Sequence, residues 1–475
     1  MKSIYKHILL VVLLLTGFSC SDSFLELEPQ QSISDEVFLS SFDDFEAAII
    51  GGYDQLQAPD LYGRYIPLVA DVMGEDVKQN ASANRAKEWA EYNGSSVDFI
   101  PREFWAELYE VVNITNRIIN AEFTPPTSLE TEFDQILGEA YAMRALAYFD
   151  LCRIFGQHYT FTTDASHPGV PIVLEFDVTG KPARSTVAEV YTQVISDFNR
   201  SIELMTIDPN PVNAGYFSVE ASQALLSRVY LYMENYEMAE SMANAVINSG
   251  KFSLVSNADY PMQFFNGNSS EAIFEMIFNL ADNPGPDHLG GMYKATGYGD
   301  YLPSIDLLLL MEGGDVRRSM FTTDDNLGGI YGNLRVNKYP SEGAEIATDN
   351  LPVIRLSEVY LNRAEARAKK AAPDFTGAQA DLNLIRQRGF PTADDVTDTG
   401  TDLIDEILIE RRIELAFEGH RIFDATRNRQ DIVRNDCTAP EVACTISYPS
   451  DRFILPIPQD ETNVNDIAQN PSYGN

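Results

Sequence analysis

Basic residues are scarce in this sequence, and their scarcity excludes one large class of functions. The 475 residues include 34 Lys and Arg against 71 Asp and Glu, which gives a net charge of −37 at pH 7. A chain this acidic repels the phosphates of nucleic acids and the surface of anionic lipids. Nucleic-acid binding is therefore excluded, and attachment to a membrane would need something other than surface charge.

Catalytic motifs are also missing. The five histidines are scattered, and no HExxH, GxSxG, Walker, Rossmann or EF-hand pattern occurs. Carboxylates are so abundant that some pair will lie at a glycosidase spacing by chance. The acidic loop between Asp394 and Asp402 could hold calcium, although a solvated loop is the better interpretation. The sequence predicts no catalytic residue, no metal and no cofactor.

Long apolar runs are absent except for Ile8–Leu15, which is far shorter than the roughly 20 residues that span a bilayer. Two lysines precede it and small residues follow, a pattern typical of a secretory signal over residues 1–19. The signal ends at Cys20 and resembles a bacterial lipoprotein box, with Gly17 where Leu is usual. We expect Cys20 to be the lipidated N-terminus of a mature chain with a net charge of −39, followed by a tether over residues 20–34. An ordinary signal or an anchor helix is the alternative.

Cysteines number only four, and none has the spacing of a metal site. In an exported protein, Cys437 and Cys444 can form a disulfide that closes a short polar loop. We favour this pairing over two free thiols. Cys152 lies in an amphipathic pattern and is expected to be a small buried residue.

Helical periodicity is what the sequence has in abundance. Apolar residues recur at every third and fourth position in segments 38–53, 105–119, 127–155, 186–202, 219–233, 236–248, 352–370, 378–388 and 403–418. Thr127 with Glu130, and Thr186 with Glu189, are placed as capping boxes. Residues 251–350 are rich in aromatic residues, Gly, Asn and Asp, which predicts loops and short strands.

A short pattern of Leu, a small residue and a Tyr recurs on three predicted helices, as Leu137-Gly138-Tyr141, Leu226-Ser227-Tyr230 and Leu356-Ser357-Tyr360. It resembles the first helix of a tetratricopeptide repeat, in which the small residue lets paired helices approach closely. Helices that share these residues by chance are the alternative. We predict a mostly α fold, in which tetratricopeptide-like helix pairs form an α-α superhelical scaffold with long inserted loops and a few short strands.

The most charged segment is Ile409–Arg429, where acids and arginines alternate. Such patterns normally form surface or partly buried ion pairs on a helix. We therefore interpret Arg421, Asp424 and Arg427 as structural residues.

Aromatic residues in polar loops are the best candidates for binding, because sugars stack on flat rings while amides and carboxylates bind their hydroxyl groups. Two loops offer this combination, with the candidate residues Trp89, Tyr92 and Asn93 in the first and Tyr293, Tyr298 and Asp300, next to Tyr301, in the second. The alternative is that these side chains anchor their loops to the helices.

Five stretches in order resemble the SusD/RagB family of outer-membrane lipoproteins. They are CSDSFLELEP, EAYAMRALAYFDLCRIFG, VIRLSEVYLNRAEARAK, ERRIELAFEGHRIFDATR and FILPIPQDETNVNDIAQNPSYG. The resemblance covers nearly the whole mature chain, with Asn465-Asp466 where Asn-Pro is common. It implies a single helical domain over residues 35–475, made of an N-terminal helical part (35–250), a loop-rich insertion (251–350) and a C-terminal part (351–475).

The resemblance also implies a function. A family member binds oligosaccharides or polysaccharides at the outer face of the outer membrane and delivers them to a SusC-like TonB-dependent transporter, without catalysis. Peptides are the alternative cargo, and a secreted glycosidase is a much weaker alternative. The family's ligand residues lie in variable loops, so the candidate residues above rest on the stacking argument alone.

Overall fold

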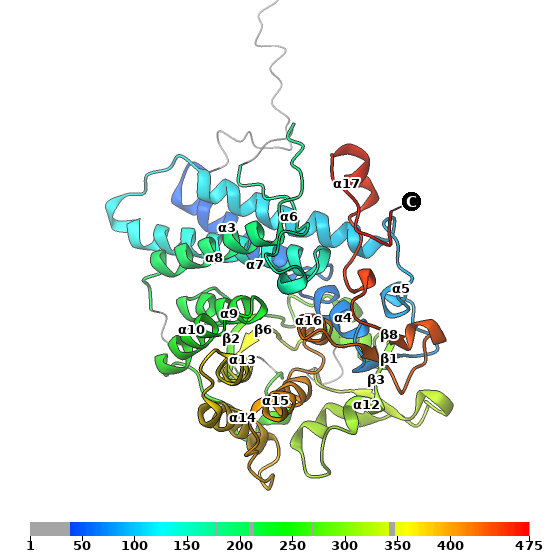
Figure 1. The fold of residues 1–475 in the computed structure, drawn as a ribbon. Coiled ribbons are helices and arrows are strands. Elements are labelled where there is room, and N and C mark those ends of the chain that lie inside the picture. Colours follow the sequence, from blue (N-terminus) through cyan, green and yellow to red (C-terminus); the bar gives the residue numbers. More distant parts are fainter. Residues whose placement is uncertain are drawn as a thin grey trace, which may run out of the picture.

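A computed structural model gives the fold of residues 39–175, 179–208, 213–265, 267, 269–341 and 347–474. Helices account for most of the regular structure, and the strands are short (Figure 1). The predicted signal segment, Cys20 and the tether lie outside the described residues. Within the described ranges, no helix combines the length and the apolar character needed to cross a membrane.

The longer helices come in two sets along the chain. The first set is α3 (Phe42–Gln57), α4 (Tyr65–Val72), α5 (Lys87–Ala90), α6 (Phe99–Asn120), α7 (Glu130–Phe155), α8 (Val187–Leu204), α9 (Val219–Tyr232) and α10 (Tyr236–Ser249). The short α11 (Leu289–Tyr293) and α12 (Ile305–Leu308) follow, and the second set is α13 (Leu356–Lys369), α14 (Phe375–Gly389), α15 (Gly400–Glu414), α16 (Arg421–Arg427) and α17 (Gln459–Val464). The prediction of a mostly helical fold is confirmed.

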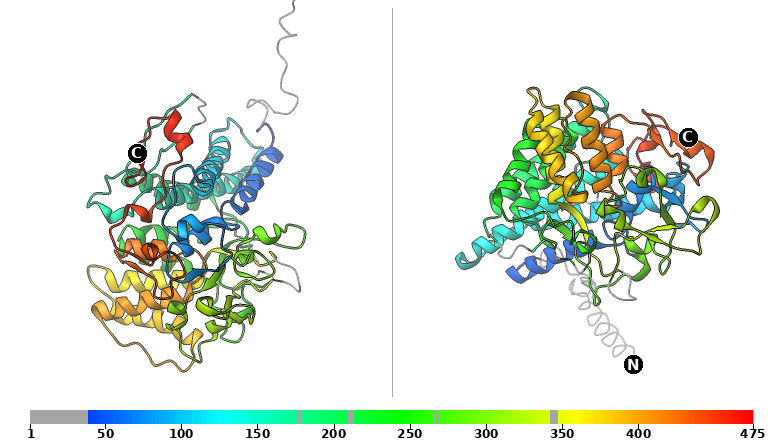
Figure 2. Two further views of the ribbon diagram at one scale, coloured as in Figure 1. Left: turned by 90° about the vertical axis from the view of Figure 1, so that its right-hand side faces the viewer. Right: turned by 90° about the horizontal axis from the view of Figure 1, so that it is seen from below.

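Neighbouring helices pack in pairs. Helix α7 packs on α6 and α8, α9 packs on α10, and α13 lies against α10, α14 and α15. The small residues of the recurring pattern lie at such contacts. A Cβ on Gly138 would come within 2.5 Å of Met205 Cγ at the end of α8, and Asn362 of α13 donates a hydrogen bond to Ser227 Oγ of α9 at 3.0 Å. Figure 2 shows these helices on one side and the loops of residues 251–350 on the other.

The strands of the described chain form two-stranded antiparallel sheets. They pair β1 (Val77–Gln79) with β3 (Tyr301–Pro303), β2 (Ala272–Met276) with β6 (Leu351–Arg355), β4 (Phe321–Thr323) with β5 (Leu334–Val336), and β7 (Ile432–Val433) with β8 (Thr445–Ile446). In the first sheet Val77 lies opposite Pro303 and Gln79 opposite Tyr301. This sheet joins the loop-rich middle of the chain to its N-terminal part.

Helix boundaries confirm some predictions and correct others. Thr186 and Glu189 form the predicted capping box at the start of α8. The box predicted at Thr127 and Glu130 is wrong, because residues 127–129 form a 3-10 turn and α7 begins at Glu130 itself. Residues 352–355 are strand rather than helix, because β2 pairs with them. Helix α15 ends at Glu414, before a turn in which Phe417 and Gly419 have positive φ.

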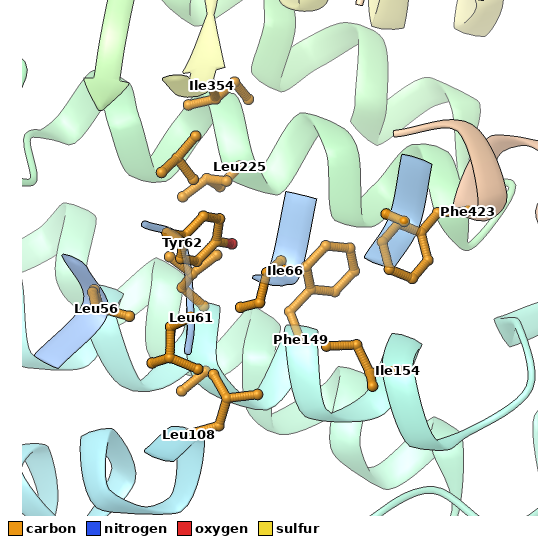
Figure 3. Close-up of a cluster of buried hydrophobic side chains, with 14 of the residues drawn as sticks. Leu56, Leu61, Tyr62, Ile66, Leu108, Phe149, Ile154, Leu225, Ile354 and Phe423 are labelled. Atoms are coloured by element: carbon orange, nitrogen blue, oxygen red, sulfur yellow. The ribbon is translucent and has the colours of Figure 1, made fainter. Parts of the chain in front are cut away.

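The apolar core draws side chains from distant parts of the chain. Figure 3 shows Leu56 of α3, Ile66 of α4, Leu108 of α6, Phe149 of α7 and Phe423 of α16 around one cluster. All five are buried. The core therefore joins helices from both sets.

The charged segment near the C-terminus is more deeply buried than predicted. Asp424 and Arg427 are buried, the side chain of Arg421 is 11% exposed, and Arg427 pairs with both Asp424 and Glu365. Arg411 donates to Asp424 at 2.7 Å. These contacts support the structural interpretation, but the pairs lie deeper than the surface or partly buried pairs that the sequence predicts. Each arginine there must face a carboxylate to offset its loss of hydration.

Three further predictions concern the cysteines and the acidic loop. Cys437 and Cys444 form a disulfide in the structure, and Cys152 is a buried free cysteine. The aspartates of the loop at Asp394–Asp402 are exposed. In the described residues, no three His, Cys, Asp or Glu side chains are arranged to hold a metal.

Candidate functional site

Three of the residues predicted to bind a ligand are buried, and for them the prediction of a binding platform is wrong. Trp89, Tyr293 and Asp300 are at most 2% exposed. Trp89 lies beneath Gly94, where a Cβ would meet its ring at 2.5 Å. Tyr293 points at Asp71, to which its hydroxyl donates at 3.3 Å. These side chains anchor the loops, which is the alternative that the sequence left open.

The other candidates in the first loop also offer no aromatic face. The Tyr92 hydroxyl donates to the carbonyl oxygen of Met73, and its ring lies 5.2 Å from the guanidinium of Arg434. Asn93 is exposed and donates to Glu91. Of the three candidates in this segment, Asn93 is exposed, Tyr92 is partly buried and Trp89 is buried.

Tyr298 is the aromatic candidate that stays half-buried at the surface, and it has a partner that the sequence did not indicate. The guanidinium of Arg85 lies 3.1 Å from the centroid of its ring. Buried Asp300 holds this arginine in place, since it accepts from the Arg85 backbone N–H at 3.1 Å and from Nη1 at 3.2 Å. Asp300 is therefore a positioning residue and Tyr298 is the residue that faces outward.

An aromatic pair lies beside Tyr298. Phe99 at the start of α6 meets Tyr65 at the start of α4 edge to face, with the ring centroids 6.3 Å apart. The Arg64 guanidinium lies 4.0 Å from the Tyr65 ring and pairs with Asp287. Tyr298 donates to the same carboxylate at 3.1 Å. We call the six residues Arg64, Tyr65, Arg85, Phe99, Asp287 and Tyr298 the aromatic–arginine cluster.

The backbone brings these segments together through close turns. The Leu289 N–H donates to the carbonyl oxygen of Gly63 at 2.8 Å, which fixes Asp287 beside Arg64. The Tyr298 N–H donates to Gly291 at 2.7 Å, and a Cβ on Gly297 would lie 2.4 Å from that same carbonyl oxygen. The pairing of β1 with β3 extends by one more hydrogen bond, in which the Asn80 N–H donates to the carbonyl oxygen of Asp300 at 2.8 Å.

The cluster combines exposed ring surface with polar groups that are already oriented. Phe99 is 47% exposed, whereas Arg64 and Tyr65 are buried. Burial raises the pKa of the Tyr65 hydroxyl, so this group stays protonated at neutral pH. Arg64 Nε is buried and has no hydrogen-bond partner among the described residues. A buried donor without a partner points to a ligand or a water, since unpaired buried donors are costly.

Two interior cavities of the described chain are too small to hold a sugar or a peptide. The cavity among Tyr62, Arg228 and His420 measures about 20 Å³, which is room for about one water molecule. The cavity lined by Arg412, Arg421 and Asp424 is smaller still.

Sequence reasoning found Tyr298 and Asp300 but missed Arg64, Tyr65, Arg85, Phe99 and Asp287. The usable signal was the stretch LYGRY at Leu61–Tyr65, where aromatic and basic residues flank a glycine in a turn. An exposed Phe at the first position of a helix was a second signal. Neither indicates which other segments lie beside it in space.

The fold defines a helical protein of tetratricopeptide-like pairs, and comparisons with known proteins agree with this fold. The C-terminal residues 322–473 match the model of the SusD family, and residues 23–231 match a model described as starch-binding associating with outer membrane.

Solved structures and curated relatives match nearly the whole chain. A SusD superfamily protein of Bacteroides thetaiotaomicron is 32% identical, with a TM-score of 0.82 over 91% of this chain and 100% of that one. A putative sugar binding protein of Bacteroides vulgatus is also 32% identical, with a TM-score of 0.84 over 92% and 100%. A SusD-like protein of Formosa agariphila is 27% identical over 99% of both chains. The chain belongs to the SusD superfamily.

Proposed function

We propose that the protein is a surface-exposed outer-membrane lipoprotein that binds oligosaccharides or polysaccharides at the aromatic–arginine cluster without cutting them. It delivers them to a SusC-like TonB-dependent transporter and is held at the membrane by the lipidated Cys20. The observation that carries the proposal is the exposed ring of Phe99 and the half-buried ring of Tyr298 beside oriented Arg and Asp side chains. The family model described as starch-binding and outer-membrane associated supports it.

The chemistry of the cluster suits a sugar. The ring faces of Phe99 and Tyr298 can cover the apolar C–H side of a pyranose, as aromatic side chains do in ligand sites. Arg64 and Arg85 can donate to hydroxyl groups, and Asp287 can accept from them. Binding and release need no more than this, and no covalent step enters the proposal.

Isothermal titration with soluble starch, laminarin and a peptide panel tests the proposal. We expect a polysaccharide to bind, and Tyr298→Ala and Phe99→Ala each to weaken it about tenfold or more, as central aromatic residues of interfaces do. Tyr298→Phe should weaken it less, since the ring remains.

Phe161→Ala is the matched control. Phe161 is 38% exposed, and its ring neighbours in the described chain are His158 and His167. This variant should bind as the wild type does. Peptide binding in place of glycan binding, or release of reducing sugar by the purified protein, would contradict the proposal.

A further inference from the structure

The arginines in and beside the aromatic–arginine cluster do not give this surface a positive charge, because the carboxylates that they pair with outnumber them. Arg64 pairs with Asp60 at 3.3 Å and with Asp287, and Arg85 pairs with Asp300 at 3.2 Å. Arg102, whose guanidinium lies 5.6 Å from the Phe99 ring, pairs with Glu103 at 2.8 Å. Three guanidinium groups therefore meet four carboxylates.

The carboxylates at the centre of the cluster are also closer to solvent than the guanidinium that they pair with. The side chain of Asp287 is 45% exposed and that of Asp60 is 29% exposed, whereas Arg64 is 9% exposed. A ligand approaching Tyr65 and Tyr298 meets Asp287 before it meets Arg64. Burial raises the pKa of Asp60, the positive charge of Arg64 acts against this, and the negative charges of Glu103 and Asp287 act with it.

We propose that the aromatic–arginine cluster selects uncharged sugar residues and rejects glycans that carry carboxylate or sulfate groups, with Asp287 as the residue that determines this specificity. The inference rests on the proposed function and names its ligand class. A hydroxyl group can donate to Asp287 and can accept from the partly exposed guanidinium of Arg85, so a neutral sugar satisfies both. A sulfate or a carboxylate can only accept, and it meets the Asp287 carboxylate at close range in a partly desolvated site.

The whole molecule also repels anions, because its net charge is −37. A test must therefore separate the local effect of Asp287 from this general repulsion. Glu203 provides the comparison, since it lies on α8, is largely exposed and forms only a surface pair with Arg200. Asp287→Asn and Glu203→Gln change the net charge by the same amount.

The experiment measures the binding of starch and laminarin, and of their sulfated derivatives, to the full mature chain at 0.15 M salt. We expect the wild type to bind a neutral glycan at least tenfold more tightly than its sulfated form. Asp287→Asn should reduce this ratio several-fold, and Glu203→Gln should leave it unchanged.

Each result has one meaning. Equal or tighter binding of the sulfated form would overturn the inference and leave the proposed glycan binding intact. An equal reduction of the ratio by Glu203→Gln would overturn the role of Asp287. Binding of no glycan, neutral or sulfated, would overturn the proposed function and the inference together.

Discussion

At the scale of single residues, His288 shows how burial sets a charge state. It is fully buried, its Nδ1 accepts from the Gly290 N–H at 2.9 Å, and its Nε2 lies 3.0 Å from the carbonyl oxygen of Asp349. The ring is therefore neutral, with its proton on Nε2. Burial lowers its pKa to about 3, and the positive charge of Lys294 contributes in the same direction.

Because of this depressed pKa, the free energy of unfolding should decrease as the pH falls. Unfolded histidine titrates near 6.5, so the unfolded chain binds a proton below that pH and the folded chain does not until about pH 3. As the pH falls from 6.5 toward 3, His288 should thus lower the free energy of unfolding by about 1.4 kcal/mol for each pH unit. Urea unfolding at pH 6 and pH 5 measures this loss. Between the two pH values, the free energy of unfolding should fall with a smaller slope in His288→Asn than in the wild type, by about 1.4 kcal/mol per pH unit. Equal slopes in the two proteins would contradict the assignment.

The burial of three aromatic residues could not be predicted from the sequence. Trp89, Tyr293 and Tyr298 all lie in segments that the sequence predicts to be polar loops, yet the first two lie in short helices and are buried, whereas Tyr298 is half-buried at the surface. The difference comes from the path of the backbone around Gly94 and Gly297. The amino-acid composition of a segment does not determine that path. The sequence could therefore identify candidate residues but could not distinguish a ring that binds a ligand from a ring that is buried against the helices.

At the scale of elements, the small residue of the recurring pattern should be required for helix packing. A Cβ on Gly138 would lie 2.5 Å from Met205 Cγ and 3.2 Å from the Ser201 carbonyl oxygen. Gly138→Ala should therefore lower the free energy of unfolding by about 1–2 kcal/mol, since overpacking outweighs the gain in helix propensity.

Gly51 of α3 is the matched control, because no described heavy atom outside its own surroundings lies within 4 Å of an added Cβ. Gly51→Ala should raise the free energy of unfolding by about 0.5–1 kcal/mol through helix propensity alone. Denaturant titration measures both variants. Stabilisation by both would show that α7 and α8 do not need the glycine.

The helices themselves were predictable because each carries a continuous apolar face. The bounds of α9, Val219–Tyr232, and of α10, Tyr236–Ser249, fall within one residue of the expected segments. The strand at Leu351–Arg355 was not predictable, because its partner β2 lies far away in the sequence. The capping box at Thr186 is local and was found, but the turn that displaces the start of α7 depends on the residues just before it.

At the scale of the whole molecule, a buried network of charges joins the parts of the chain. Arg355 at the end of β6 donates to Glu271 at 3.1 Å, to Glu414 of α15 at 2.6 Å, and to Glu418 at 2.7 Å. The apolar core likewise runs from Phe45 to Ile467. The family resemblance predicts one domain, and these shared contacts favour it, although the sequence could not indicate which carboxylate faces which arginine.

One domain with such a core should unfold in one step. Calorimetry of the mature chain should show a single transition whose calorimetric and van't Hoff enthalpies agree. Arg355→Met should move that transition to lower temperature without splitting it, because the three buried carboxylates then lose a shared cation and keep only Arg317, Lys338 and Arg388 as partners. The expected cost is about 3–5 kcal/mol in the free energy of unfolding. Arg200→Met, at an exposed pair, should cost no more than about 1 kcal/mol. Two separate transitions, or equal effects of the two variants, would show that the network does not unite the chain.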